Sequence, residues 1–185
     1  MNGLSTLELK RPSLSERLLR RRPKENAAIE INNYVATTPL ESVTGHDLAR
    51  ILAAHKCDYA AVKPALGVIY TQVLDHFTQD GRISAEEQAE LTHLRKVFRL
   101  SEAEADALDQ EVLLPLYQQA VRSYFADGHF TFKEREQVER LSRDLGQDSA
   151  AADAVVMDEA FRAFERSTKR TAPADPPAPG DEKAP

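Results

Sequence analysis

Four carboxylates with regular spacing are the residues of this chain whose types could do chemistry. Asp80 and Glu87 form one pair, and Asp127 and Glu134 repeat it 47 residues further along the chain. Carboxylate oxygens are the ligands that Ca²⁺ and other hard divalent cations prefer. One hypothesis is therefore a site for a divalent cation (Ca, Mn or Zn), with these four carboxylates as the candidate ligands.

The two pairs belong to a longer repeated motif, Asp-Gly-x-(Ile/Phe)-(Ser/Thr)-x-x-Glu, which folding alone can also explain. Glycine adopts positive φ in a turn, and Ser or Thr three residues before Glu forms a capping box at a helix start. A capping carboxylate at a surface turn could also recruit a cation, so both interpretations stand. On the folding interpretation, the turn and cap residues are Gly81, Ser84, Gly128 and Thr131, and the apolar residues Ile83 and Phe130 are plugs of the core.

No set of residues points to an enzyme. The only cysteine, Cys57, is expected to be a free thiol of the core, which suits a reducing compartment. The sequence holds neither a glycine-rich phosphate loop nor a Gly-x-Ser-x-Gly elbow. No stretch approaches the roughly 20 apolar residues that a membrane-spanning helix needs. We therefore expect a non-enzymatic, cytoplasmic protein.

Charge is distributed unevenly along the chain. The net charge is −6, but residues 1–40 carry +3 and residues 41–166 carry −9. An acidic domain argues against nucleic acid as the ligand, because neutralised phosphates supply most of the non-specific affinity of such binding. The sequence instead predicts an adaptor that presents an acidic face to a protein partner, and the alternative is a sensor of divalent cations.

Apolar residues between the two ends of the chain recur at spacings of three and four, as on one face of a helix. This pattern predicts an all-α fold, an antiparallel bundle of six or seven helices. The 47-residue offset persists outside the motif, which predicts two similar halves. Its matching positions include Tyr70 with Tyr117, Leu94 with Leu141, Phe98 with Leu145 and Leu108 with Val155.

The two ends differ from the middle in composition. Residues 1–40 are expected to be a basic, mostly flexible arm with one short helical segment, and residues 167–185 a disordered Pro/Ala-rich tail. The helical domain would then span residues 41–166. Peripheral contact with a membrane or docking to a partner could use the arm, through Leu14, Leu18, Leu19, Arg20, Arg21 and Arg22.

The duplicated motif, with Leu91-x-x-Leu94 and Val138-x-x-Leu141 after it, resembles the TerB-like domain. That family includes tellurite-resistance TerB and the N-terminal region of the membrane-anchored DnaJ-like protein. The resemblance covers residues 43–166 and is strongest over 66–146. It implies an acidic, all-helical domain of two similar halves, a bacterial origin, a place in stress-response or defence-related complexes and metal binding at the four carboxylates.

Overall fold

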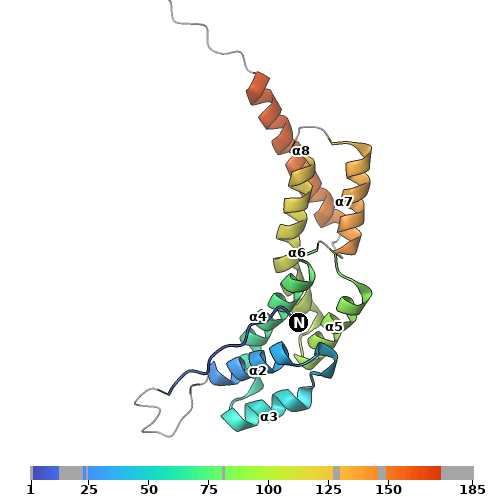
Figure 1. Cartoon of the computed structure of the whole chain (residues 1–185). Coiled ribbons are helices and arrows are strands. Elements are labelled where there is room, and N and C mark those ends of the chain that lie inside the picture. The colour runs from blue at the N-terminus through green and yellow to red at the C-terminus, as the bar shows by residue number, and fades with distance from the viewer. Residues whose placement is uncertain are drawn as a thin grey trace, which may run out of the picture.

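The fold is all-α, as the sequence predicts. The computed structural model describes residues 2–12, 23, 25–80, 82–126, 130–145 and 149–171, and these residues contain helices and no strand (Figure 1). Their elements are α2 (Glu25–Thr37), the short 3₁₀ helix η1 (Leu40–Ser42), α3 (Gly45–His55), α4 (Tyr59–Phe77), α5 (Ala85–Val97), α6 (Glu102–Tyr124), α7 (Phe132–Asp144) and α8 (Ser149–Thr171).

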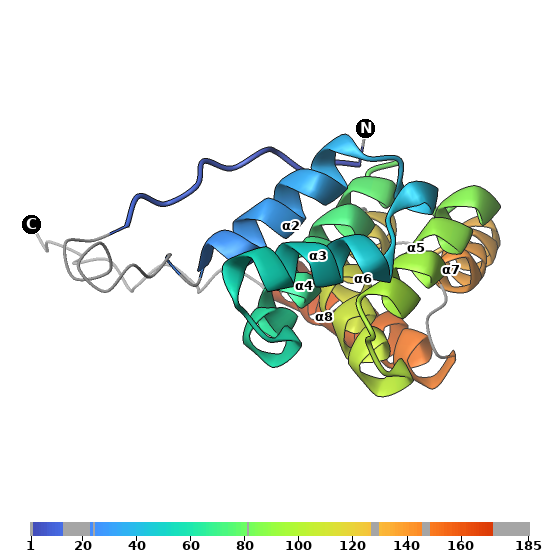
Figure 2. The ribbon, with the colours of Figure 1, turned by 90° about the horizontal axis from the view of Figure 1, so that it is seen from below.

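Helix α6 links the two ends of the molecule. It packs on α4 in the half that also holds α2, α3 and α5, and on α7 and α8 in the other half (Figure 1). Seen from below, α2 and α3 lie together beside α4 (Figure 2). The buried residues of α6 reach from Ala105 near its start to Val121 near its end, so the same helix contributes to the core of both halves.

The helix starts are fixed by local chemistry. Ser84, Ser101 and Thr131 each cap a helix, and the Glu three residues later reaches back to the cap N–H in a complete capping box. The bounds of α5 and α7 are 47 residues apart, and so are those of α6 and α8. The spacing of the sequence motif is thus also the spacing of the helices that follow it.

The residues expected to plug the core pack against it without being fully buried. Ile83 and Phe130 are both half-buried and contact the apolar core. Phe130 stacks on the buried Phe125 with a ring-centroid distance of 4.3 Å. Each side chain therefore anchors the turn that precedes a helix cap to the apolar core.

The structure differs from the expectation of a flexible arm over residues 1–40. Helix α2 lies within that range, and its Ala27, Ile31 and Val35 are fully buried in the core. The sequence does not predict this helix because asparagines at positions 26, 32 and 33 interrupt its apolar face with polar residues. At the other end, α8 continues to Thr171, past the expected start of the tail at residue 167. The proposed docking arm (Leu14 to Arg22) lies outside the described residues.

The asparagines of α2 hold the extended N-terminal segment against the helix. Asn26 pairs with Lys10, accepting from its N–H at 2.8 Å and donating to its carbonyl at 2.9 Å. Asn33 makes the same two-way contact with Leu7, and Asn32 donates to the carbonyl of Ser5. Amide side chains thus satisfy the backbone of a segment that belongs to no sheet or helix.

Removing one amide should release one part of this segment. With Asn26→Ala, the Lys10 amide should exchange with solvent faster by about fivefold, because the lost hydrogen bond contributes roughly 1 kcal/mol. Hydrogen exchange followed by NMR measures this, with Asn33→Ala as the reciprocal control that accelerates Leu7 instead. Equal protection of Lys10 in the wild type and in Asn26→Ala would contradict the pairing.

A second expectation concerns acid stability. The Lys63 ammonium and the cap at Ser101 lower the pKa of Glu104 from its ordinary 4.5 to about 2 in the folded chain. A carboxyl whose pKa is lower when folded stabilises the fold above its unfolded pKa and loses this contribution as the pH falls toward its folded pKa. Between about pH 4.5 and 2, the stability of Glu104→Gln should therefore fall less steeply than that of the wild type. Parallel pH profiles from urea unfolding would contradict the assignment.

Candidate functional site

The carboxylates predicted to bind a cation are engaged in turn and cap contacts. The Asp80 carboxylate accepts from the Arg82 amide at 3.1 Å, and Glu87 accepts from the amide of Ser84 at 2.8 Å. Glu134 accepts from the amide of Thr131 at 2.6 Å. Among the described residues, no group of three His, Cys, Asp or Glu side chains is placed to hold a metal ion. The remaining residues of the motif, Gly81, Asp127 and Gly128, lie outside the described residues.

Two side chains with reactive groups, Cys57 and His55, are engaged in other contacts. Cys57 is half-buried, and its thiol lies 3.5 Å from the carbonyl of Asp58. His55 has a nearly buried ring whose Nε2 lies 2.6 Å from a carboxylate oxygen of Glu30. The His55 contact ties α3 to α2, and the Cys57 contact lies in the turn before α4, so both are explained by folding.

A polar network joins three helices in the first half. The Tyr70 hydroxyl on α4 donates to Asp109 on α6 at 2.7 Å. Arg95 on α5 donates through Nε to the Tyr70 oxygen at 2.8 Å and forms a salt bridge with Asp109. Burial, followed by the hydrogen bond to Asp109, raises the pKa of Tyr70, so the phenol keeps its proton and remains a donor. We call these three residues the polar lock.

The second half keeps only one member of this lock. At positions 47 residues further on, Tyr70 corresponds to Tyr117, but Arg95 corresponds to Ser142 and Asp109 to Val156. Serine is too short to span two helices, and valine offers no acceptor. The charged bridge that joins α5 to α6 therefore has no equivalent between α7 and α8.

A groove lies where the second lock would be. It holds about 900 Å³ and runs between α7 and α8 over the side chain of Tyr117 on α6. Its lining is mostly apolar and includes both Ser142 and Val156. The other lining residues are Phe130, Thr131, Phe132, Arg135, Val138, Glu139, Arg143, Ala152, Asp153 and Met157.

The floor of the groove carries a hydroxyl without a partner. Tyr117 is only 1% exposed, and its hydroxyl makes no hydrogen bond in the described part of the chain. Burial, and then the negative charge of Asp153, raise the pKa of Tyr117. Asp153 is exposed at the edge of the groove and, within the same described part, forms no salt bridge. The hydroxyl faces the space of the groove, where water or a ligand can bond to it.

The basic residues of the lining are held on their own helix. Arg135 pairs with Glu139 at 3.0 Å, one turn away on α7. Arg143 donates to the backbone carbonyl of Glu139 at 3.2 Å. Neither contact crosses the groove to α8, so these residues leave Asp153 without a counter-charge.

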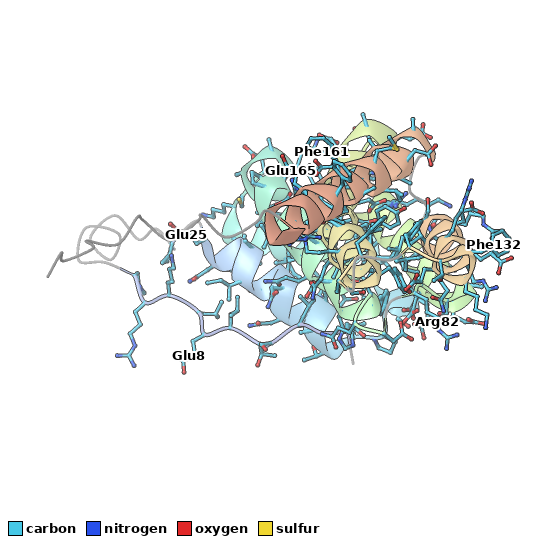
Figure 3. The ribbon with its side chains drawn as sticks, turned by 90° about the horizontal axis from the view of Figure 1, so that it is seen from above. Glu8, Glu25, Arg82, Phe132, Phe161 and Glu165 are labelled. Carbon is cyan, nitrogen blue, oxygen red and sulfur yellow. The ribbon has the colours of Figure 1, made fainter. Side chains whose placement is uncertain are left out.

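Exposed apolar side chains gather around the same two helices. Phe132 on α7 and three residues of α8 are between 63% and 75% exposed, more than any other large apolar residue described. Phe132 lies at the outer edge of α7, and Phe161 projects from α8 (Figure 3). The three α8 residues share one face because they are four and three positions apart. They are Met157, Phe161 and Phe164.

The sequence indicates Tyr117 and the 47-residue offset but not the groove. The available signal was the loss of charge at two of the matched positions, where Arg95 gives way to Ser142 and Asp109 to Val156. That loss predicts a cavity only because Arg95 bridges two helices, a contact that the structure shows and the sequence does not.

The comparisons with known proteins give no match. The chain matches no family model, no curated protein and no solved structure. The described residues include no helix long and apolar enough to cross a membrane.

The two tyrosines should respond differently to loss of the hydroxyl. Tyr70→Phe should lower the free energy of unfolding by about 1–3 kcal/mol, because the partly buried Arg95 and Asp109 each lose their hydrogen bond to the phenol. Tyr117→Phe should change it by less than about 0.5 kcal/mol, since no bond is lost. Urea unfolding measures both, and equal losses for the two variants would contradict the difference between the halves.

Proposed function

We propose that this protein is a non-enzymatic helical interaction domain that binds a protein partner in the groove between α7 and α8. The observation that carries the proposal is that the two most exposed large apolar residues of the described part, Phe132 and Met157, both line this groove. Exposed apolar clusters of this kind mark interaction sites in soluble proteins.

The groove has the composition of a protein-binding surface. Apolar side chains, including Phe132 and Met157, form its walls, and charged residues stand at its edges. Protein interfaces combine an apolar centre with a polar rim and are enriched in aromatic residues and Met. An antiparallel pair of helices with a hollow between them suits an amphipathic helix of the partner, which would lay its apolar face into the groove.

Charge gives the partner a further character. Asp153 places an unpaired carboxylate at the groove, and the domain from residue 41 to 166 carries −9. A net negative domain attracts basic partners and repels acidic ones at long range. We therefore propose that the partner is basic and places a basic side chain beside Asp153.

The wider setting is part of the same proposal. The repeated motif and the helix bounds that follow it at a 47-residue offset support membership of the TerB-like family. On that assignment the protein acts in the bacterial cytoplasm, in a stress-response or defence-related complex. The single cysteine, which forms no disulfide within the chain, agrees with a reducing compartment.

The proposal predicts which surface a native partner needs. Phe132→Asp and Met157→Asp should each abolish recovery of the partner in affinity purification from the native host, because they place a charge in an apolar contact. Both side chains are largely exposed, so the variants should keep the fold and the circular dichroism spectrum of the wild type.

Val68→Asp is the matched control. Val68 is 56% exposed on α4 and does not line the groove, so this variant should recover the same proteins as the wild type. Proteins that all three variants capture equally would place the interaction elsewhere. A wild-type chain that recovers no specific protein would refute an interaction role.

A further inference from the structure

The groove lacks a cation at the position that corresponds to Arg95, where the chain has Ser142. On the basis of the proposed function, we propose that the partner segment inserts an arginine side chain over Tyr117, where its guanidinium bonds the Tyr117 oxygen and pairs with Asp153. This arginine would take the place that Arg95 holds over Tyr70 in the first half. The partner would thus supply in trans a lock that α5 supplies in cis.

The first half shows the chemistry that this position accepts. Arg95 reaches from α5 to the oxygen of Tyr70 and to the carboxylate of Asp109, and Asp106 on α6 adds a second negative charge nearby. In the second half, Tyr117 matches Tyr70 and Asp153 matches Asp106. One acceptor and one charge therefore remain at the corresponding places, while the donor is gone.

Arginine fits the remaining groups better than the other charged side chains. Its planar guanidinium offers five N–H donors, so one side chain can serve a phenol oxygen and a carboxylate together. An incoming carboxylate would face Asp153, whose charge already raises the pKa of Tyr117. The two arginines of the lining are already engaged on α7, since Arg135 pairs with Glu139 and Arg143 donates to the Glu139 carbonyl.

The exposed rim favours a peptide segment over a small molecule as the carrier of this arginine. A small ligand in the groove would leave the outer faces of Phe132 and Met157 in water, whereas compact ligand pockets bury most of their ligand. A helix that lies along α7 and α8 covers these residues. We expect its arginine to be flanked by apolar residues three or four positions away on the same face.

Display selection of a random helical-peptide library against the full chain tests the proposal. Groove-binding peptides are those that no longer bind Phe132→Asp but still bind Val68→Asp. We expect them to share one arginine within an apolar face. Replacing that arginine by Gln, or Asp153 by Asn, should weaken the affinity by about tenfold or more, as for loss of a charged hydrogen bond.

A double-mutant cycle identifies the contact. The Arg→Gln peptide and the Asp153→Asn protein should lose little more together than either does alone, because each removes the same pair. Tyr117→Phe should show the same coupling. The inference would be overturned by fully additive losses of affinity or by groove-binding peptides that contain no basic residue. It would also be overturned if arginine amide bound as tightly as the peptides.

The outcomes separate this inference from the proposed function. Peptides that bind in the groove without an arginine would leave the interaction site standing and remove only the arginine. A selection that yields no peptide sensitive to Phe132→Asp would overturn both the groove and its ligand.

Transplanting the lock gives a second, independent test. Ser142→Arg combined with Val156→Asp restores the residues of Arg95 and Asp109 at the matching positions. The double variant should keep its helix content and have a free energy of unfolding no lower than that of the wild type. It should bind the selected peptides at least about tenfold more weakly, because its own arginine competes for Tyr117. Undiminished affinity in the folded double variant would contradict the proposed position of the arginine.

Discussion

The requirement that one helix serve both ends of a single apolar core constrains the rest of this structure. Helix α6 packs on α4 with its first half and on α7 and α8 with its second. Its buried positions must therefore satisfy two different sets of neighbours, from Ala105 to Val121. The capped turns before α5 and α7 therefore have to start α5 where it packs on α4 and α7 where it packs on α6. The capping boxes at Ser84 and Thr131 achieve this with local hydrogen bonds.

The two ends of the bundle are packed with different chemistry. In the first half, Arg95 fills the space between α5 and α6, and its charge is matched by Asp109. A partly buried ion pair costs desolvation, and it stabilises a fold only when its hydrogen bonds are complete, as Tyr70 makes them here. In the second half, Ser142 and Val156 avoid that cost but leave the space unfilled. The first half is thus closed by its own side chains, and the second is left open.

Local signals were readable from the sequence, and long-range ones were not. The caps at Ser84, Ser101 and Thr131 depend on residues three positions apart, so their spacing alone predicts the helix starts. Helix α2 was missed because its asparagines bind the backbone of residues 5–10, a contact that no periodic pattern encodes. The groove depends on which helices α6 brings together. Its key residues, Tyr117 and Val156, look like ordinary members of apolar stripes until the structure places them at one cavity.

The open half also explains why the unpaired hydroxyl of Tyr117 is compatible with a stable fold. A polar group at the floor of an open groove can be solvated by water, so the free chain loses little by leaving it without a protein partner. An entering segment that displaces this water with an apolar group leaves Tyr117 and Asp153 unsatisfied, at a cost of about 1–3 kcal/mol for each. A segment that brings a donor avoids this cost. The hydroxyl and the carboxylate therefore act more by penalising wrong partners than by binding the right one tightly, which makes a groove of general apolar character selective.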